Sequence, residues 1–244
     1  MAASSDIRAW SWAETAIGFR PEFLDFDRGI RVGNLEPHER ITRILKGALE
    51  EQHRQPFVTE RWGRGVFWQW IGFLPRANRE AKPVSSDVSF GCAKFFVTVD
   101  TDEREFKCGL QVERGYLRAS GDERAWRLAP DWDWHRLTRG LRSRAPFDRE
   151  LRRLVRDGFH VQAGGFSERH HFTRATLPGP LALSRLLDRA PAREWAGFQL
   201  YYPLAEADVR ASSGRDLVET MLAVFDEVTP AMNACMQIRL ERHG

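Results

Sequence analysis

Long apolar runs are missing from this 244-residue sequence, and their absence excludes membrane-spanning helices. No stretch approaches the roughly 18 consecutive apolar residues that such a helix needs. The first twelve residues include Asp6 and Arg8 with no apolar run before them, which is unlike a secretory signal. We therefore expect a soluble, cytoplasmic protein that has no membrane partner.

Cysteine is also scarce. The three cysteines, Cys92, Cys108 and Cys235, are odd in number and far apart in the chain. A disulfide framework or a Cys-x-x-Cys metal site would have closer, paired spacing. We interpret the three as reduced thiols that pack as small buried apolar groups, and we expect neither a metal nor a cofactor.

The common catalytic and nucleotide-binding signatures are absent as well. The sequence has no phosphate-binding GxxxxGKS or GxxxxGKT loop, no GxGxxG after a strand, no HExxH helix and no GxSxG turn. This excludes the common motif-bearing enzyme classes, and it leaves open whether the protein is an enzyme.

The composition is that of a globular protein, with 42% apolar and 29% charged residues. No Pro/Ser/Gly-rich tract or block of like charge separates two halves. We expect a single domain over residues 1–244, with an irregular or weakly helical N-terminal segment at 1–35.

Hydrophobic periodicity predicts elements of both kinds. Helices are expected from Glu36-Pro37 to about Gln52, at 132–142, at 146–157, and from Ser213 to a kink or break at Pro230. Strands are expected at 57–62, 66–74, 89–100, 105–117, 159–163 and 194–202. Because strands and helices do not alternate regularly, the pattern favours an α+β fold. Its central, mostly antiparallel sheet of about five or six strands would pack against N-terminal, middle and long C-terminal helices.

Arginine is abundant, with 33 residues against 4 lysines, although the net charge is only +3. A genome rich in G and C is one explanation, and selection for guanidinium groups that bind phosphate bidentately is the other. Residues 135–157 carry eight arginines and three acids, so the positive charge is concentrated there.

Helical spacing places these arginines on one side of two helices, opposite apolar residues such as Phe147 and Leu151. Such a surface suits a series of phosphate groups. The leading hypothesis is a non-enzymatic module that binds nucleic acid, DNA or RNA, or another phosphate ligand. The alternative is a solvated helix face with Asp148 and Glu150 as local partners. The candidate binding residues are Arg136, Arg139, Arg142, Arg149, Arg152, Arg153 and Arg156, with Arg169 and Arg174 from a later loop.

A second hypothesis is a hydrolase, metal-dependent or His-assisted, that acts on an anionic or phosphorylated substrate. His170 and His171 lie in a polar segment after Gly164-Gly165, which we interpret as a loop, and could supply a general acid or base. Asp87 followed by Glu105-Phe106-Lys107 is similar to the Asp…Glu-x-Lys pattern of metal-dependent nucleases. A hairpin turning near residue 102 would bring Asp100, rather than Asp87, close to Glu105. The candidate catalytic residues are therefore His170, His171, Asp100, Glu105 and Lys107.

A third hypothesis is a protein–protein adaptor or homodimer. Met232, Cys235 and Met236, beyond Pro230, could form an exposed apolar strip. The tryptophans are interpreted differently: Trp62, Trp68 and Trp70 lie in the most apolar strand pair, and we expect them in the core. We expect Trp132 and Trp134 to wedge the basic helices against the sheet.

Two resemblances concern the layout of the chain. The segment Phe198-Gln-Leu-Tyr-Tyr-Pro-Leu and the helix from Leu217 to Pro230 resemble the end of a widespread uncharacterised bacterial family, which closes with a strand, a Pro-Leu turn and a helix. The hairpin from Phe95 to Leu117 lies where that family has its central hairpin. The segment Trp70-Ile-Gly-Phe-Leu, the same hairpin and the strand with Tyr201-Tyr202 are similar in layout to the N-terminal DNA-recognition domain of modification-dependent restriction systems. That resemblance implies DNA reading rather than catalysis, although a fold does not fix a function.

Overall fold

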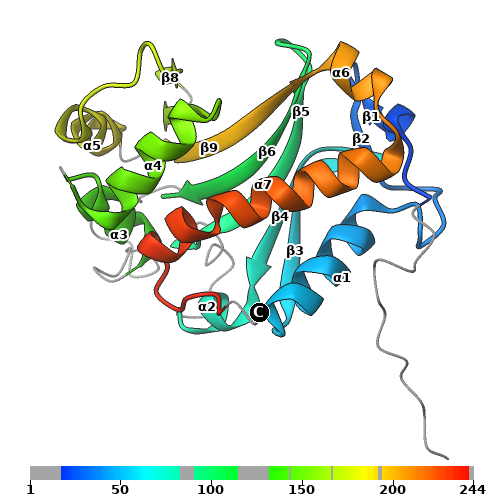
Figure 1. Ribbon diagram of the computed structural model, residues 1–244, viewed down its shortest axis with the longest axis horizontal. Helices are drawn as coiled ribbons and strands as arrows, with labels where there is room; N and C mark the ends of the chain where they lie inside the picture. The colour runs from blue at the N-terminus through cyan, green and yellow to red at the C-terminus, as the bar shows by residue number, and fades with distance from the viewer. Residues whose placement is uncertain are drawn as a thin grey trace, which may run out of the picture.

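In a computed structural model, the structure describes residues 18–82, 91–114, 132–142, 144–165, 167–191 and 194–241. These residues form an α+β fold, as the sequence predicts (Figure 1). The sheet has nine strands rather than five or six: β1 (Leu24–Asp25), β2 (Gly29–Arg31), β3 (Phe57–Arg64), β4 (Phe67–Pro75), β5 (Lys94–Asp100), β6 (Glu105–Glu113), β7 (His160–Gly165), β8 (Arg169–Phe172) and β9 (Ala196–Ala205). The helices are α1 (Ile41–His53), α2 (Arg76–Glu80), α3 (Asp133–Gly140), α4 (Pro146–Arg156), α5 (Pro180–Arg189), α6 (Glu206–Ala211) and α7 (Gly214–Cys235), after a short 3-10 helix, Pro21–Phe23.

The strands pair antiparallel in the order β1-β2-β4-β5-β6-β9-β7-β8, and β3 pairs with the other edge of β4. The β5–β6 hairpin is as predicted, with Asp100 directly opposite Glu105. The last strand in the sequence, β9, lies between β6 and β7. Long-range pairing therefore places residues near 199 beside residues near 111 and 162.

The sheet has one apolar face and one polar face, as alternation along each strand requires. The apolar face carries side chains such as Phe95, Leu110 and Phe198, and it packs against the helices, with Phe225 of α7 stacked on Phe95. The long helix α7 crosses this face, beside α1 and α4 (Figure 1). The opposite side, here called the polar face, carries residues such as Lys94, Lys107, Gln111, Gln199 and Gln162.

Helix α7 begins as the sequence predicts. Ser213 and Asp216 form a reciprocal capping box. The helix is not broken at Pro230 but continues to Cys235. Met232, Cys235 and Met236 are fully buried, so they do not form the exposed apolar strip expected for a homodimer. Their burial in the core holds the last turns in place despite the proline.

Several short elements were not predicted. Residues 24–31, expected to be irregular, contain β1 and β2, which are joined by a tight turn; Gly29, the first residue of β2, has a φ of 104°. The segment with His170 and His171, expected to be a loop, is strand β8, and it pairs with β7. Gly164 and Gly165, expected to form the turn, belong to β7 itself. Strand β8 could not be predicted from the sequence, because its residues are polar and lack the apolar alternation that is typical of a strand. It is defined by its pairing with β7.

The three cysteines are free and buried, as predicted. Burial raises the pKa of Cys92 to about 11 and that of Cys108 further, so the thiol form predominates at neutral pH. None of the helices within the described ranges combines the length and the apolarity needed to cross a membrane.

Candidate functional site

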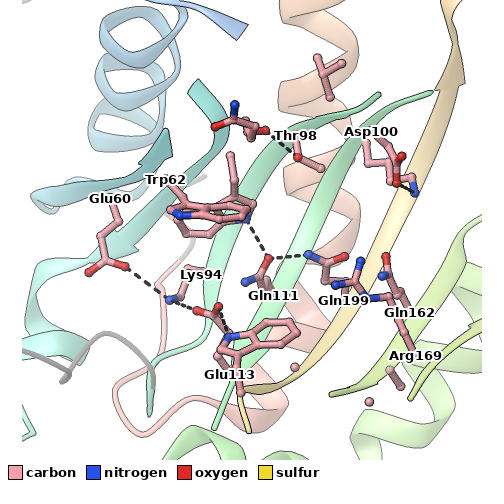
Figure 2. A pocket seen from close by; sticks show the side chains of 18 of the residues that line it. Glu60, Trp62, Lys94, Thr98, Asp100, Gln111, Glu113, Gln162, Arg169 and Gln199 are labelled. Atoms are coloured by element: carbon pink, nitrogen blue, oxygen red, sulfur yellow. Dashed lines mark hydrogen bonds and ion pairs between the residues drawn. The ribbon is translucent and has the colours of Figure 1, made fainter. Parts of the chain in front are cut away.

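A cavity of about 730 Å³ lies on the polar face of the sheet (Figure 2). Its lining begins with Glu60 on β3, crosses β4, β5, β6, β9 and β7, and ends with Arg169 on β8. The volume is in the range typical of small-molecule sites. Because each strand contributes alternate side chains to this face, the same pleat that builds the apolar core also builds the cavity wall.

Three tryptophans stand around the cavity: Trp62 on β3, Trp70 on β4, and Trp195 just before β9. Trp62, expected in the core, is instead 70% exposed, and its direct cross-strand partner is Trp70. A register shift between Trp62 and Gly63 interrupts the β3–β4 ladder at this position. The indole N–H of Trp195 donates to Glu113 Oε1 (2.8 Å), which fixes that ring.

Lys94 is fully buried on this face. Its Nζ lies 2.6 Å from Glu113 Oε2, 3.4 Å from Glu60 Oε2 and 5.5 Å from the centre of the Trp70 ring. Burial alone disfavours the ammonium, but the two carboxylates more than compensate and raise the pKa of Lys94 above its usual value. Lys94 is therefore a permanent cation that is already paired with carboxylates.

A row of three glutamines crosses the floor of the cavity (Figure 2). Gln111, Gln199 and Gln162 are direct cross-strand partners on β6, β9 and β7. Gln199 Nε2 donates to Gln111 Oε1 (2.7 Å). In the amide orientation that satisfies both of its neighbours, Gln162 donates to Gln199 Oε1 (3.1 Å) and accepts from Nε and Nη1 of Arg169 (3.0 and 3.1 Å). The amide dipoles thus align in one direction, starting at a guanidinium, and such chains polarise one another.

The row ends at Gln111, which is only 3% exposed. Its Oε1 accepts from both Gln199 Nε2 and the Trp70 indole N–H (2.8 Å). An indole nitrogen can only donate, so it fixes which end of the Gln111 amide is the oxygen. The Gln111 amide nitrogen has no acceptor among the described residues. Two donors at the end of a polarised row are therefore left to face the cavity.

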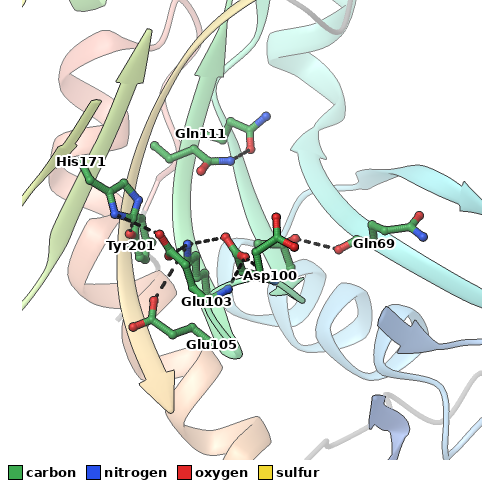
Figure 3. A network of polar contacts seen from close by, with 11 residues as sticks. Gln69, Asp100, Glu103, Glu105, Gln111, His171 and Tyr201 are labelled. Atoms are coloured by element: carbon green, nitrogen blue, oxygen red, sulfur yellow. Dashed lines mark hydrogen bonds and ion pairs between the residues drawn. The ribbon is translucent and has the colours of Figure 1, made fainter. Parts of the chain in front are cut away.

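A second polar network lies beside the first and includes Asp100, Glu103 and His171 (Figure 3). Lys107 Nζ is 2.7 Å from Asp100 Oδ2, 2.5 Å from Glu103 Oε2 and 3.9 Å from Glu105 Oε2. Burial of Asp100 opposes its ionisation, yet hydrogen bonds from Lys107 and from the Glu103 backbone N–H outweigh it and lower the pKa of Asp100. Lys107 also lies 5.1 Å from the centre of the Tyr201 ring.

His171 joins this network from β8. Its Nε2 is 2.9 Å from the Tyr201 hydroxyl, and its Nδ1 is 3.6 Å from Glu103 Oε1. Partial burial lowers the pKa of His171, and burial among carboxylates raises that of Tyr201. The neutral imidazole is therefore the form present at neutral pH, with the Tyr201 hydroxyl donating to Nε2.

Of the predicted catalytic residues, the fold brings Asp100, Glu105, Lys107 and His171 together. His170 points away from them: its ring stacks on Phe172 and its Nε2 lies 3.1 Å from Glu168. Asp87 lies outside the described residues. In the part of the chain that the structure describes, no three His, Cys, Asp or Glu side chains are grouped as metal ligands. The carboxylates around Lys107 are bound to its ammonium instead.

The predicted arginine surface lies on α3 and α4, in the helix layer and away from the cavity. Arg152 is bound to Asp148 (2.9 Å), and Arg153 bridges Glu150 and Glu227 (3.0 and 2.7 Å). Arg142, Arg149 and Arg156 are exposed and have no carboxylate partner among the described residues. Arg136 is half-buried and Arg139 is exposed on α3, while Arg174 is exposed after β8. Arg169 is separate from this group and belongs to the cavity.

Sequence reasoning missed most of the cavity lining. The pattern that could have indicated the lining is the alternation along β6, which places Lys107, Gln111 and Glu113 on the same face as Gly109. It predicted an apolar inner face from Phe106, Cys108, Leu110 and Val112, and that face is buried as expected. The polar residues between them, Lys107, Gln111 and Glu113, are buried too.

No protein-family model and no curated protein matches this chain. The two resemblances drawn from the sequence therefore stay predictions about layout.

Proposed function

We propose that this protein binds a small, uncharged polar ligand in the cavity on the polar face of the sheet. The observation that carries the proposal is the amide group of Gln111, which lines the cavity floor, is 3% exposed as a whole residue, and has a nitrogen without an acceptor among the described residues. A ligand oxygen or ring nitrogen in the cavity can accept from this nitrogen, and such a hydrogen bond contributes about 0.5–1.5 kcal/mol net.

Charge balance supports a neutral ligand. The lining includes four acids and four bases: Glu60, Asp100, Asp102 and Glu113 against Arg61, Lys94, Lys107 and Arg169. Lys94 and Lys107 are both held by carboxylates at 2.7 Å or less. A phosphate or another anion would have to compete with these buried pairs for each cation, at a large desolvation cost.

The same pairing favours binding over hydrolysis of an anionic substrate. Asp100 is held ionised by Lys107, so it is a poor general acid, and Lys107 is surrounded by acceptors rather than poised as a nucleophile. His171 is neutral at physiological pH, but its Nε2 is already occupied by the Tyr201 hydroxyl. The groups in this network satisfy one another, as expected of a rigid binding wall.

The test is a calorimetric and thermal-shift screen of neutral monosaccharides, nucleobases and nucleosides against the wild type and Gln111→Glu. A glutamate keeps the acceptor for Trp70 and Gln199 but cannot donate when ionised. We expect a hit to lose at least tenfold in affinity in this variant, which is about 1.4 kcal/mol. A matched control, Gln55→Glu, changes charge equally outside the cavity and should bind normally. Equal binding by Gln111→Glu, or no hit at millimolar concentration, would contradict the proposal.

The arginine-rich helices carry a second proposal, nucleic-acid binding at a separate surface. It is favoured by the exposure of Arg142, Arg149 and Arg156 without carboxylate partners among the described residues. Anisotropy with labelled duplex DNA, single-stranded DNA and RNA across a salt series tests it, because phosphate contacts weaken steeply with salt. The Arg149→Glu/Arg156→Glu variant should lose this binding. If the variant binds as the wild type does, or if the wild type binds no nucleic acid at low salt, the arginines form only a solvated helix face.

A further inference from the structure

We infer that the ligand of the cavity is a neutral oligosaccharide lying across the strands, with one sugar ring stacked on Trp62. This inference rests on the proposed function and narrows it to one substrate class. It follows from the length of the cavity, the flat side chains that line it and the mixture of donors and acceptors on its floor.

The cavity is long. Its lining runs through seven strands in the order β3-β4-β5-β6-β9-β7-β8, which is six steps between neighbouring strands. At about 4.8 Å a step, the path is about 29 Å before the curvature of the sheet is considered. A volume of about 730 Å³ spread over such a path makes a shallow groove rather than a round pocket. A chain of several linked units fits that shape better than one compact molecule.

The aromatic residues supply flat apolar surface at one end of the groove. Trp62 is 70% exposed beside its cross-strand partner Trp70, and the Trp70 indole N–H is anchored on Gln111. Trp62 and Trp70 both line the cavity beside polar groups, and aromatic side chains combined with a few polar groups are typical of ligand sites. A sugar ring has C–H groups on its faces and hydroxyls around its edge, so it can cover an indole while its hydroxyls reach the floor.

The floor offers donors and acceptors in alternation, as hydroxyl groups require. The Gln111 amide nitrogen is a donor without an acceptor among the described residues. Two residues further along the same face of β6, the Glu113 carboxylate accepts from Lys94 and Trp195 and has further lone pairs. The glutamine row continues from there toward Gln162 and Arg169. Each hydroxyl both donates and accepts, so it can bridge such neighbours without bringing a net charge.

The two other chain-like ligands fit less well. Single-stranded nucleic acid is bound in grooves with an excess of positive charge, whereas this lining has equal numbers of acids and bases. An extended peptide binds by adding a strand to a sheet edge, whereas this groove runs across strands that are already paired.

An array of immobilised neutral and sialylated glycans tests the inference with the intact protein. Calorimetry then follows a length series, from one to six units, of the neutral sugar that binds best. We expect affinity to rise with the number of units and to fall at least tenfold in Trp62→Ala. Because Trp62 is exposed, this variant should fold, which its thermal midpoint verifies. The matched control is Leu181→Ala, an exposed apolar residue on α5 outside the cavity, 60% exposed; it should bind as the wild type does.

Three results would overturn the inference: no neutral glycan bound, binding that Trp62→Ala leaves unchanged, or a preference for single-stranded DNA that Trp62→Ala abolishes. A nucleoside or nucleobase that binds through Gln111 while no glycan does would overturn the oligosaccharide alone and leave the proposed function standing. If no glycan, nucleoside or nucleobase binds, both the inference and the proposed function are overturned.

Discussion

At the scale of single residues, the use of lysine is the most informative feature of the chain. Three of its four lysines, Lys82, Lys94 and Lys107, are buried and paired with carboxylates, whereas the many arginines are mostly on the surface. The compact ammonium and the planar guanidinium are not interchangeable in such a site, because their donors point in different directions. The rare buried lysines therefore mark places with strict geometry.

This account predicts that Lys94→Arg destabilises the protein although the charge is kept. The larger guanidinium must displace Glu113, Glu60 or the Trp70 ring, and overpacking of this kind costs about 1–3 kcal/mol. Urea unfolding of the variant measures the loss. Lys46→Arg, on the surface of α1, is the control and should stay within about 0.5 kcal/mol of the wild type. Equal stability of the two variants would show that the Lys94 site is not sterically strict.

His171 predicts a pH dependence. Its folded pKa lies below the usual value, because burial favours the neutral ring that accepts from Tyr201. The unfolded chain then binds the proton more readily, so this contribution is fully present above about pH 6.5 and is lost as the pH falls through the folded pKa. Thermal midpoints between pH 7.5 and 5 should fall less steeply in His171→Asn than in the wild type. Parallel curves for the two proteins would contradict this role.

At the scale of elements, close approach of β6 and β9 holds the glutamine row together. A Cβ on Gly109 would lie 2.1 Å from the backbone oxygen of Leu200, so only glycine allows this spacing. We predict that Gly109→Ala costs about 1–3 kcal/mol by forcing the strands apart.

The control for this prediction is Gly47→Ala in α1, where an added Cβ meets nothing within 4 Å. It should raise stability by about 0.5–1 kcal/mol, because alanine is the better helix former. Chemical denaturation of both variants gives the comparison. If Gly109→Ala leaves the free energy of unfolding unchanged, β6 and β9 can move apart without a loss of stability.

The elements that the sequence predicted well have strong local patterns. Helix α4 has apolar residues from Phe147 to Val155 at helical spacing, α7 has its cap at Ser213, and the β5–β6 hairpin alternates around an acidic turn. The strands that it missed, β1, β2 and β8, are two to four residues long and are defined by their partners. Pro230 was expected to interrupt α7, but tertiary packing of the following turn outweighs the lost backbone hydrogen bond.

At the scale of the whole molecule, the two faces of the sheet carry different kinds of side chains. Helices and their arginines cover the apolar face, and the polar face carries the cavity with its paired charges and glutamine row. The glutamine row could not be predicted from the sequence, because Gln111, Gln199 and Gln162 are joined only by the placement of β9 between β6 and β7. That placement depends on pairing between distant segments, which no local pattern reports. Trp62 was misplaced for a related reason, since alternation cannot tell which face of a sheet stays uncovered.

The most direct test of the binding cavity is a ¹H–¹⁵N spectrum of the tryptophan indole groups during titration with the best ligand from the screen. The chain has nine tryptophans, and their indole signals can be assigned by single Trp→Phe substitutions. If the cavity binds the ligand, the signals of Trp62, Trp70 and Trp195 shift together with one affinity. Those of Trp132, at the start of α3, and Trp134, within it, are buried outside the cavity and stay in place. A ligand that binds without moving the three cavity signals, or that moves those of Trp132 and Trp134 instead, would place the binding site elsewhere on the molecule.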